Sequence, residues 1–181
     1  MDQESELDLI KNARSGNQQA FRRLVEAHQG LAYSIAFRFT KNENESGDIV
    51  QEAFVKVWNN LSRYDSAFRL KTWISRIVTN LCLDYLKSAR KKKTISENRV
   101  MVTEPSFEDD QLEGKELKSI VMQLAGQLTD KQQAVFILRD LEMMTPEETC
   151  QALEMTPGNM KSNLYYARLK IKEGLQKFYK Y

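Results

Sequence analysis

With 181 residues, 41% hydrophobic and 29% charged, the chain is long enough for one compact domain or two small ones. Three prolines and seven glycines in a sequence rich in leucine, lysine and glutamate favour helices over a β-sandwich or β-barrel. No apolar run approaches the roughly 20 residues of a membrane-spanning helix, and the acidic, amphipathic N-terminus is unlike a signal peptide. Because the two cysteines form no CxxC pair and show no metal-ligand spacing, we expect a reduced, cytoplasmic protein without a metal or other cofactor.

Charge is strongly segregated along the chain, although the net charge is only +2. Residues 61–93 hold nine lysines and arginines against two acids, a net charge of +7. Residues 94–116 hold two against seven, or −5, and residues 161–181 hold six against one, or +5. Two basic blocks are typical of a protein that binds nucleic acid at two places, because phosphate contacts supply most of the affinity. Solvated helix faces are the alternative explanation.

Apolar residues recur at helical spacing in both halves of the chain, and no stretch alternates with period two. In the first half the predicted helices cover residues 4–15, 17–40, 48–61 and 72–88, with a polar break over 41–47 and a loop over 63–70. In the second half they cover residues 117–127, 130–141, 146–153 and 157–178. We therefore expect an all-α chain of two small domains, residues 1–92 and 115–181, joined by a flexible acidic linker, residues 93–114.

The helix predicted over residues 48–61 has a polar face opposite its apolar one. Val55 stands on this polar face as an exposed apolar residue among carboxylates. An ordinary solvated surface is one interpretation, and a docking face for a basic partner, with Val55 adding contact area, is the other. The residues of the face are Asp48, Gln51, Glu52, Val55, Lys56 and Asn59.

The next predicted helix, over residues 72–88, and the loop before it combine cations with aromatic rings. One side of the helix gathers Arg76, Asn80, Lys87 and Arg90, and such a stripe suits a phosphate backbone. In the loop, rings and cations interleave in a way that suits unpaired bases, whereas core packing of the rings is the alternative. The loop residues are Arg63, Tyr64, Phe68, Arg69 and Lys71.

Residues 145–172 read as a capped short helix, a brief turn and a capped longer helix, the form of a helix-turn-helix. Thr129 and Thr145 each begin a capping box. Glu154 occupies the turn where glycine is usual, and the cost of a positive φ predicts a differently built turn. The outer face of the longer helix offers small polar groups for base edges and cations for phosphates: Asn159, Lys161, Ser162, Asn163, Tyr166, Arg168 and Lys170.

These runs resemble a known family. Asp48–Phe54, DIVQEAF, resembles the D-x-x-Q-E-x-F motif of sigma-70-type factors, and Thr72–Asn80, TWISRIVTN, resembles the TWL-x-x-I-x-x-N segment that follows it. EETCQAL over 147–153 and KSNLYYAR over 161–168 resemble the EEIA-x-x-L and VKSRL-x-RAR helix-turn-helix. With only these two blocks, in family order, the chain resembles the short extracytoplasmic-function (ECF) group.

The resemblance implies a sigma factor that binds core RNA polymerase, directs it to −10 and −35 promoter elements and promotes DNA melting without catalysis. The polar face of residues 48–59 would dock on the β′ clamp helices, and the polymerase β flap is a further partner. The loop of residues 63–71, with Trp73, would hold a base flipped from the melted −10 element. The helix face from Arg76 to Arg90 would contact the −10 region, and residues 157–172 would enter the major groove at −35. An anti-sigma factor is a further candidate partner, and no membrane insertion is expected.

Some positions depart from the family pattern. Asn163 and Tyr166 stand where basic residues are frequent, so we expect fewer phosphate contacts from the recognition helix. Leu70, before the tryptophan, stands where an aromatic residue is common, a departure that bears on how the melted strand is held. A stand-alone helix-turn-helix regulator is the alternative function, although residues 1–92 offer no ligand-pocket signature. An enzyme is disfavoured because His28, the only histidine, lacks a partner motif, and no phosphate-binding loop or nucleophile elbow is present.

Overall fold

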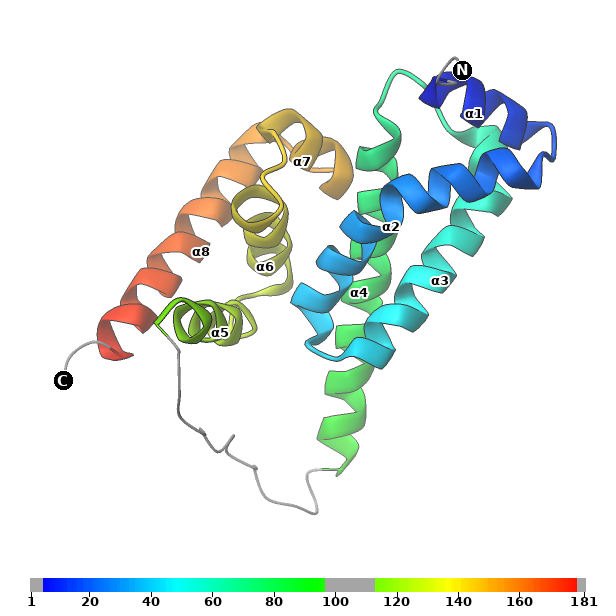
Figure 1. Ribbon diagram of the computed structural model, residues 1–181. Coiled ribbons are helices and arrows are strands. Elements are labelled where there is room, and N and C mark those ends of the chain that lie inside the picture. Colours follow the sequence, from blue (N-terminus) through cyan, green and yellow to red (C-terminus); the bar gives the residue numbers. More distant parts are fainter. Residues whose placement is uncertain (1–4, 97–112, 179–181) are drawn as a thin grey trace.

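The computed structural model describes residues 5–96 and 113–178, and all regular structure in these two ranges is helical (Figure 1). The N-terminal domain contains α1 (Glu6–Arg14), α2 (Gln18–Thr40), α3 (Glu43–Asn60), the 3-10 turn η1 (Leu61–Arg63) and α4 (Leu70–Ser96). The C-terminal domain contains α5 (Glu113–Ala125), α6 (Asp130–Phe136), the π-helical turn η2 (Ile137–Leu141), α7 (Pro146–Leu153) and α8 (Pro157–Phe178). The prediction of two helical domains is confirmed. Most of the predicted linker lies outside the described residues.

The N-terminal domain is built on α2, α3 and α4, which pack against one another, while α1 packs on α2. Small side chains at the contacts, Ala32 and Ala36 on α2 and Ala53 on α3, are fully buried and allow the helices to approach closely. Ile35 and Val78 fill the space between them. The hydrophobic stripes that predicted these helices therefore form one apolar core.

Helix α3 begins earlier than its hydrophobic pattern indicates, so the predicted polar break over residues 41–47 is wrong beyond Asn42. Lys41 ends α2 in a left-handed conformation with φ 55°, and the Asn42 side chain then accepts the backbone N–H of Glu45 at 3.1 Å. Glu43 and Glu45 lie in the first turn, where carboxylates favour the positive end of the helix dipole. Because the start depends on capping rather than burial, a hydrophobic pattern does not detect it.

In the C-terminal domain α8 packs across α5 and α6, and α7 packs against α8. Both predicted capping boxes are confirmed: Thr129 and Gln132 exchange bonds at the start of α6, and Thr145 and Glu148 do so at the start of α7. The apolar residues between the helices include Leu128, buried after α5. These caps determine where the two short helices begin.

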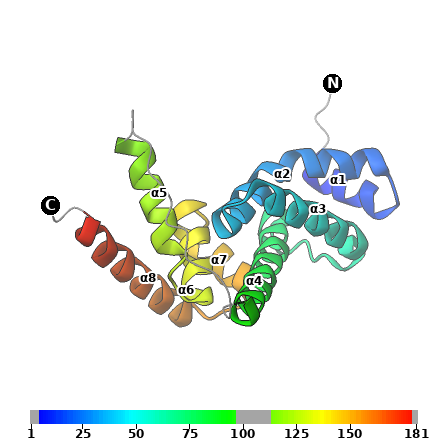
Figure 2. The ribbon, with the colours of Figure 1, turned by 90° about the horizontal axis from the view of Figure 1, so that it is seen from below.

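The two domains also contact each other directly, α7 against α4 and η2 against α2 (Figure 2). Leu138, Met144 and Ala152 of the C-terminal domain are at most 2% exposed and belong to the same apolar cluster as the core of the N-terminal domain. We call these three residues the apolar seam. The described part of the chain is thus one closed arrangement.

We expect Asn42→Ala to lower the free energy of unfolding by about 1 kcal/mol, because it removes the cap of α3. Urea denaturation of the full chain measures this change. Asn44→Ala, an exposed position in the same first turn, is the matched control and should change stability little. A neutral Asn42→Ala would contradict a helix start at Glu43.

Candidate polymerase and DNA interfaces

The polar face of α3 is exposed as predicted. All six predicted residues, Asp48, Gln51, Glu52, Val55, Lys56 and Asn59, are exposed, while Ala53 and Val57 on the opposite side are buried in the core. Val55 is 58% exposed, and Glu52 pairs with Lys56 at 3.0 Å. The face is therefore a continuous acidic and polar strip around one apolar residue, suited to a partner with complementary charge.

The loop between η1 and α4 is organised around a buried ring. Tyr64 is 6% exposed, its ring lies 5.1 Å from that of Trp73, and its hydroxyl donates to the Phe68 carbonyl. Arg14 donates to the carbonyls of Leu61 and Tyr64 and so ties the loop to α1. Tyr64 thus takes the core position that we weighed as its alternative. Phe68, 43% exposed, is the aromatic residue that the loop presents.

The predicted cations of the loop and the predicted stripe of α4 are accessible. Among them Arg63, Arg69, Asn80, Lys87 and Arg90 are exposed, and Lys71 and Arg76 are half-buried. Several of these cations face carboxylates of the C-terminal domain. Lys71 lies 2.8 Å from Glu148, Arg76 lies 2.7 Å from Glu154, and Arg90 lies 2.6 Å from Asp130. Sequence reasoning missed these partners, because helical periodicity does not indicate which helices of different domains face each other.

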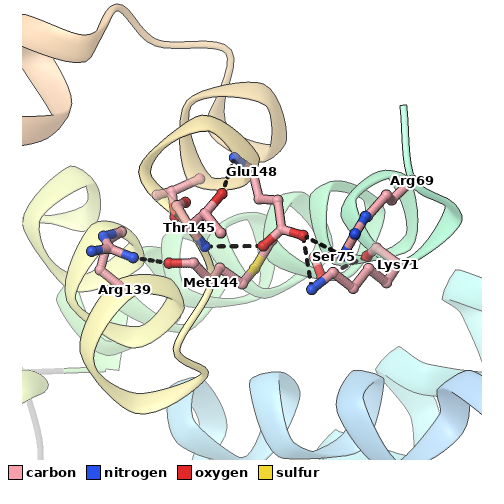
Figure 3. A network of polar contacts seen from close by, with 8 residues as sticks. Arg69, Lys71, Ser75, Arg139, Met144, Thr145 and Glu148 are labelled. Carbon is pink, nitrogen blue, oxygen red and sulfur yellow. Dashed lines mark hydrogen bonds and ion pairs between the residues drawn. The ribbon is translucent and has the colours of Figure 1, made fainter. Parts of the chain in front are cut away.

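Glu148 is the most buried of these carboxylates, with a side chain 10% exposed (Figure 3). One oxygen accepts the Thr145 backbone N–H at 2.9 Å, and the other lies 2.8 Å from Lys71 Nζ and 3.6 Å from Arg69. Burial raises the pKa of Glu148, but the hydrogen bonds from Lys71 and Thr145 and the charges of Lys71 and Arg69 outweigh it, so the pKa is lowered. The carboxylate is therefore ionised at neutral pH.

A second buried carboxylate joins α2 to the end of η2. Glu142 is 9% exposed at its side chain and pairs with Arg38, while the Ser34 hydroxyl donates to it at 2.6 Å. Arg38 also donates to the Leu141 carbonyl at 3.3 Å. The contact between the domains is thus polar at several points around the apolar seam.

A cleft of about 540 Å³ lies where the two domains meet. On one side are the Phe68 and Trp73 rings and the Arg76 guanidinium, and on the other are Glu154 and Met155 of the turn after α7. The loop predicted to hold a flipped base therefore borders the C-terminal domain in this arrangement.

The helix-turn-helix is present as α7, a three-residue turn and α8. Glu154 has φ 49° and ψ 47°, so the expectation of a differently built turn is wrong: a glutamate adopts the left-handed conformation that glycine usually supplies. The predicted outer face of α8 is exposed except for half-buried Asn163, whose amide donates to the Asn159 carbonyl at 2.8 Å. This exposed face includes Asn159, Lys161, Ser162, Tyr166, Arg168 and Lys170.

Arg168 has a structural partner that the sequence does not indicate. Its guanidinium makes two bonds to the Asp140 carboxylate, at 2.8 and 2.6 Å, which brace α8 against η2. The hydrogen bond with Asp140 raises the pKa of Arg168 further. Lys170 Nζ donates to Gln132 at 3.3 Å. Of the cations predicted for this face, Arg168 is therefore the one whose charge is most fully neutralised within the domain.

The residues described by the structure show no grouping of histidine, cysteine and acidic side chains suited to a metal ion. Within the same ranges, no helix is both long and apolar enough to cross a bilayer. Cys82 is buried in the N-terminal core, and burial raises the pKa of its thiol to about 12. This thiol is therefore protonated at neutral pH.

The fold and the exposed surfaces define a class of protein with two helical domains, the second carrying a helix-turn-helix. Residues 24–92 match the family Sigma-70 region 2, and residues 118–171 match Sigma-70, region 4. The chain therefore belongs to the sigma-70 family, in its ECF group, and it is a sigma factor. Sigma factors are non-enzymatic transcription initiation factors.

Known relatives match most of the chain. The ECF RNA polymerase sigma factor SigW of Bacillus subtilis is 26% identical over 180 residues, 92% of this chain and 95% of that protein. A probable RNA polymerase sigma factor of Haemophilus influenzae is 30% identical over 148 residues, 72% of this chain and 76% of that protein. In fold the chain is similar to CnrH, solved in complex with the cytosolic domain of CnrY, with a TM-score of 0.71 at 23% identity, covering 97% of this chain and 99% of that one.

We expect Glu148→Gln to lower the free energy of unfolding at pH 7 by roughly 1–2 kcal/mol. Since the pKa of Glu148 is lower in the folded chain, its stabilising effect is present above the ordinary value of 4.5 and disappears as pH falls through the folded-state pKa. Urea denaturation at pH 7 and at about pH 3 measures the difference between wild type and variant. Glu147→Gln, exposed on the same helix, is the control. An equal difference in stability between wild type and Glu148→Gln at both pH values would contradict a lowered pKa of Glu148 in the folded chain.

Proposed function

We propose that this sigma factor docks on core RNA polymerase through the polar face of α3 and meets the −10 element through the loop before α4 and the α4 cations. The outer face of α8 reads the −35 element, and the C-terminal domain meets the polymerase β flap. The observation that supports this assignment is that each predicted set lies largely on one accessible face. The protein works in the cytoplasm.

Within this proposal, promoter opening needs no chemistry from the chain. Phe68 at the loop surface and the cations around it bind the single-stranded form better than the duplex. A ligand that binds one of two states more tightly shifts the equilibrium towards that state, so binding favours melting. The chain catalyses nothing itself. An anti-sigma factor is a partner of the same proposal, by analogy with the sigma factor RpoE of Bartonella quintana, which was solved in complex with the anti-sigma factor NepR and is similar in fold with a TM-score of 0.67.

We expect the double charge reversal Asp48→Lys and Glu52→Lys to reduce affinity for core RNA polymerase at least tenfold, because it inverts the charge of the α3 face. Binding of the full chain to core enzyme from Bacillus subtilis measures the loss, and circular dichroism monitors the fold. Glu26→Lys with Glu173→Lys, two exposed acids on α2 and α8, is the control with the same charge change. Unchanged affinity of the first variant would contradict docking through α3. A wild-type chain that binds duplex DNA alone and ignores core enzyme would favour the stand-alone regulator.

We expect the combined substitutions Asn159→Ala, Ser162→Ala and Tyr166→Ala to change the preferred −35 sequence, because each removed base contact changes discrimination by about 1–3 kcal/mol. Transcription by holoenzyme from a promoter library measures the preference. Glu173→Ala, exposed further along α8, is the control. The same −35 motif from both variants would argue against α8 as the recognition helix.

A further inference from the structure

Arg14, in the last turn of α1, reaches across to the loop proposed to hold a flipped base. Its guanidinium donates to the Leu61 carbonyl at 3.0 Å and to the Tyr64 carbonyl, and its central carbon lies 5.7 Å from the centre of the Tyr64 ring. These contacts all go to the segment that joins α3 to α4, and η1 in this segment packs against α1 (Figure 1). Helix α1 lies outside the residues that match Sigma-70 region 2, so no role comes to Arg14 from that match.

Helix α1 is itself fixed on the N-terminal domain. Glu6 Oε1 lies 2.9 Å from Nε2 of His28, whose side chain on α2 is only 11% exposed. The apolar side of α1 is buried in the core of the domain through Leu9, Ile10 and Ala13. Because its first turn and its apolar side are both held, α1 gives Arg14 a rigid base from which to bind the loop.

The loop is also organised from within, by the Tyr64 side chain. The Tyr64 hydroxyl donates to the Phe68 carbonyl, and the Tyr64 ring packs against Trp73. Side chains therefore bind three backbone carbonyls of this segment, those of Leu61, Tyr64 and Phe68. Arg14 binds the first two of these carbonyls, and the residue that Arg14 holds binds the third.

Two successive contacts thus link the exposed Phe68 ring to α1. Arg14 holds the Tyr64 backbone, and Tyr64 holds the Phe68 carbonyl. A loop that becomes ordered only on binding loses conformational entropy at that moment, whereas a loop ordered in advance avoids this cost. A base that leaves the duplex therefore meets a surface that is already in place.

We propose that Arg14 is a positioning residue for promoter melting, which holds residues 61–68 in the shape that receives an unpaired base at Phe68. This inference rests on the proposed function, which assigns the loop to the −10 element. In this role Arg14 acts through Leu61 and Tyr64 and does not itself bind the DNA. Docking on core polymerase through α3 does not use the contacts of Arg14, so substitution can separate the two activities.

Three substitutions in the full-length chain test this role. Arg14→Gln removes the charge and the bonds to both carbonyls. Arg14→Lys keeps the charge, but a single ammonium group replaces the planar fork that reaches two carbonyls. Lys11→Gln makes the same change in net charge as Arg14→Gln at an exposed position three residues earlier on α1, and it is the matched control. Because Arg14 is itself exposed, these changes open no cavity in the core.

Binding is measured with holoenzyme formed from each variant and core polymerase of Bacillus subtilis. Fluorescence anisotropy reports affinity for a labelled single strand with the −10 sequence that the wild-type chain selects from a promoter library. Affinity of the chain for core polymerase is measured in parallel.

If the loop keeps its binding shape in only a tenth of the Arg14→Gln molecules, apparent affinity for the strand falls about tenfold. We expect that loss in Arg14→Gln and a smaller loss in Arg14→Lys. Strand affinity of Lys11→Gln, and core affinity of all three variants, should stay within about twofold of wild type.

A double-mutant cycle with Tyr64→Phe tests whether the two contacts act in series. Tyr64→Phe keeps the ring against Trp73 but removes the hydroxyl that binds the Phe68 carbonyl, so we expect weaker binding of the strand. Because residues that act through one another are not additive, Arg14→Gln combined with Tyr64→Phe should lose less affinity than the product of the two single losses.

Strand affinity of Arg14→Gln within about twofold of wild type would overturn the inference. Equal losses of strand and core affinity would also overturn it, because they indicate a purely structural role. Full strand affinity in Arg14→Lys would show that only the charge at this position matters, and independent losses in the cycle would contradict the path through Tyr64. If the wild-type chain transcribes no promoter of the library with core polymerase, the proposed function fails and the inference fails with it.

Discussion

The position of Glu148 between Lys71 and Arg69, beside the apolar seam, is the contact on which the described arrangement depends. An exposed ion pair such as Arg76 with Glu154 contributes at most about 1 kcal/mol, so the charges alone do not hold two domains together. Burial of Leu138, Met144 and Ala152 supplies a non-directional attraction, and the carboxylates give the contact its register.

The contact between the two domains also involves the cations proposed to bind DNA. In the described arrangement Lys71, Arg76 and Arg90 face carboxylates of the C-terminal domain. The polar face of α3 and most of the outer face of α8 are exposed in the same arrangement.

The sequence predicted the helices well where burial determines them and less well elsewhere. Hydrophobic periodicity located α2 and α8, and side-chain capping rules located the starts of α6 and α7. The start of α3 was missed because Asn42 caps a first turn without apolar residues. The outer faces were predicted from spacing alone, but the pairing of Arg168 with Asp140 and of Arg76 with Glu154 was not. Such contacts depend on how helices meet in space, which no local pattern contains.

The most direct test of this account is the distance between the domains in solution, measured by fluorescence transfer between dyes on Gln29 of α2 and Glu173 of α8, both exposed. The account predicts high transfer efficiency in the free chain and a large drop when core polymerase and promoter DNA are added together. Low efficiency in the free chain, or the same high efficiency in an initiation complex active in transcription, would contradict it.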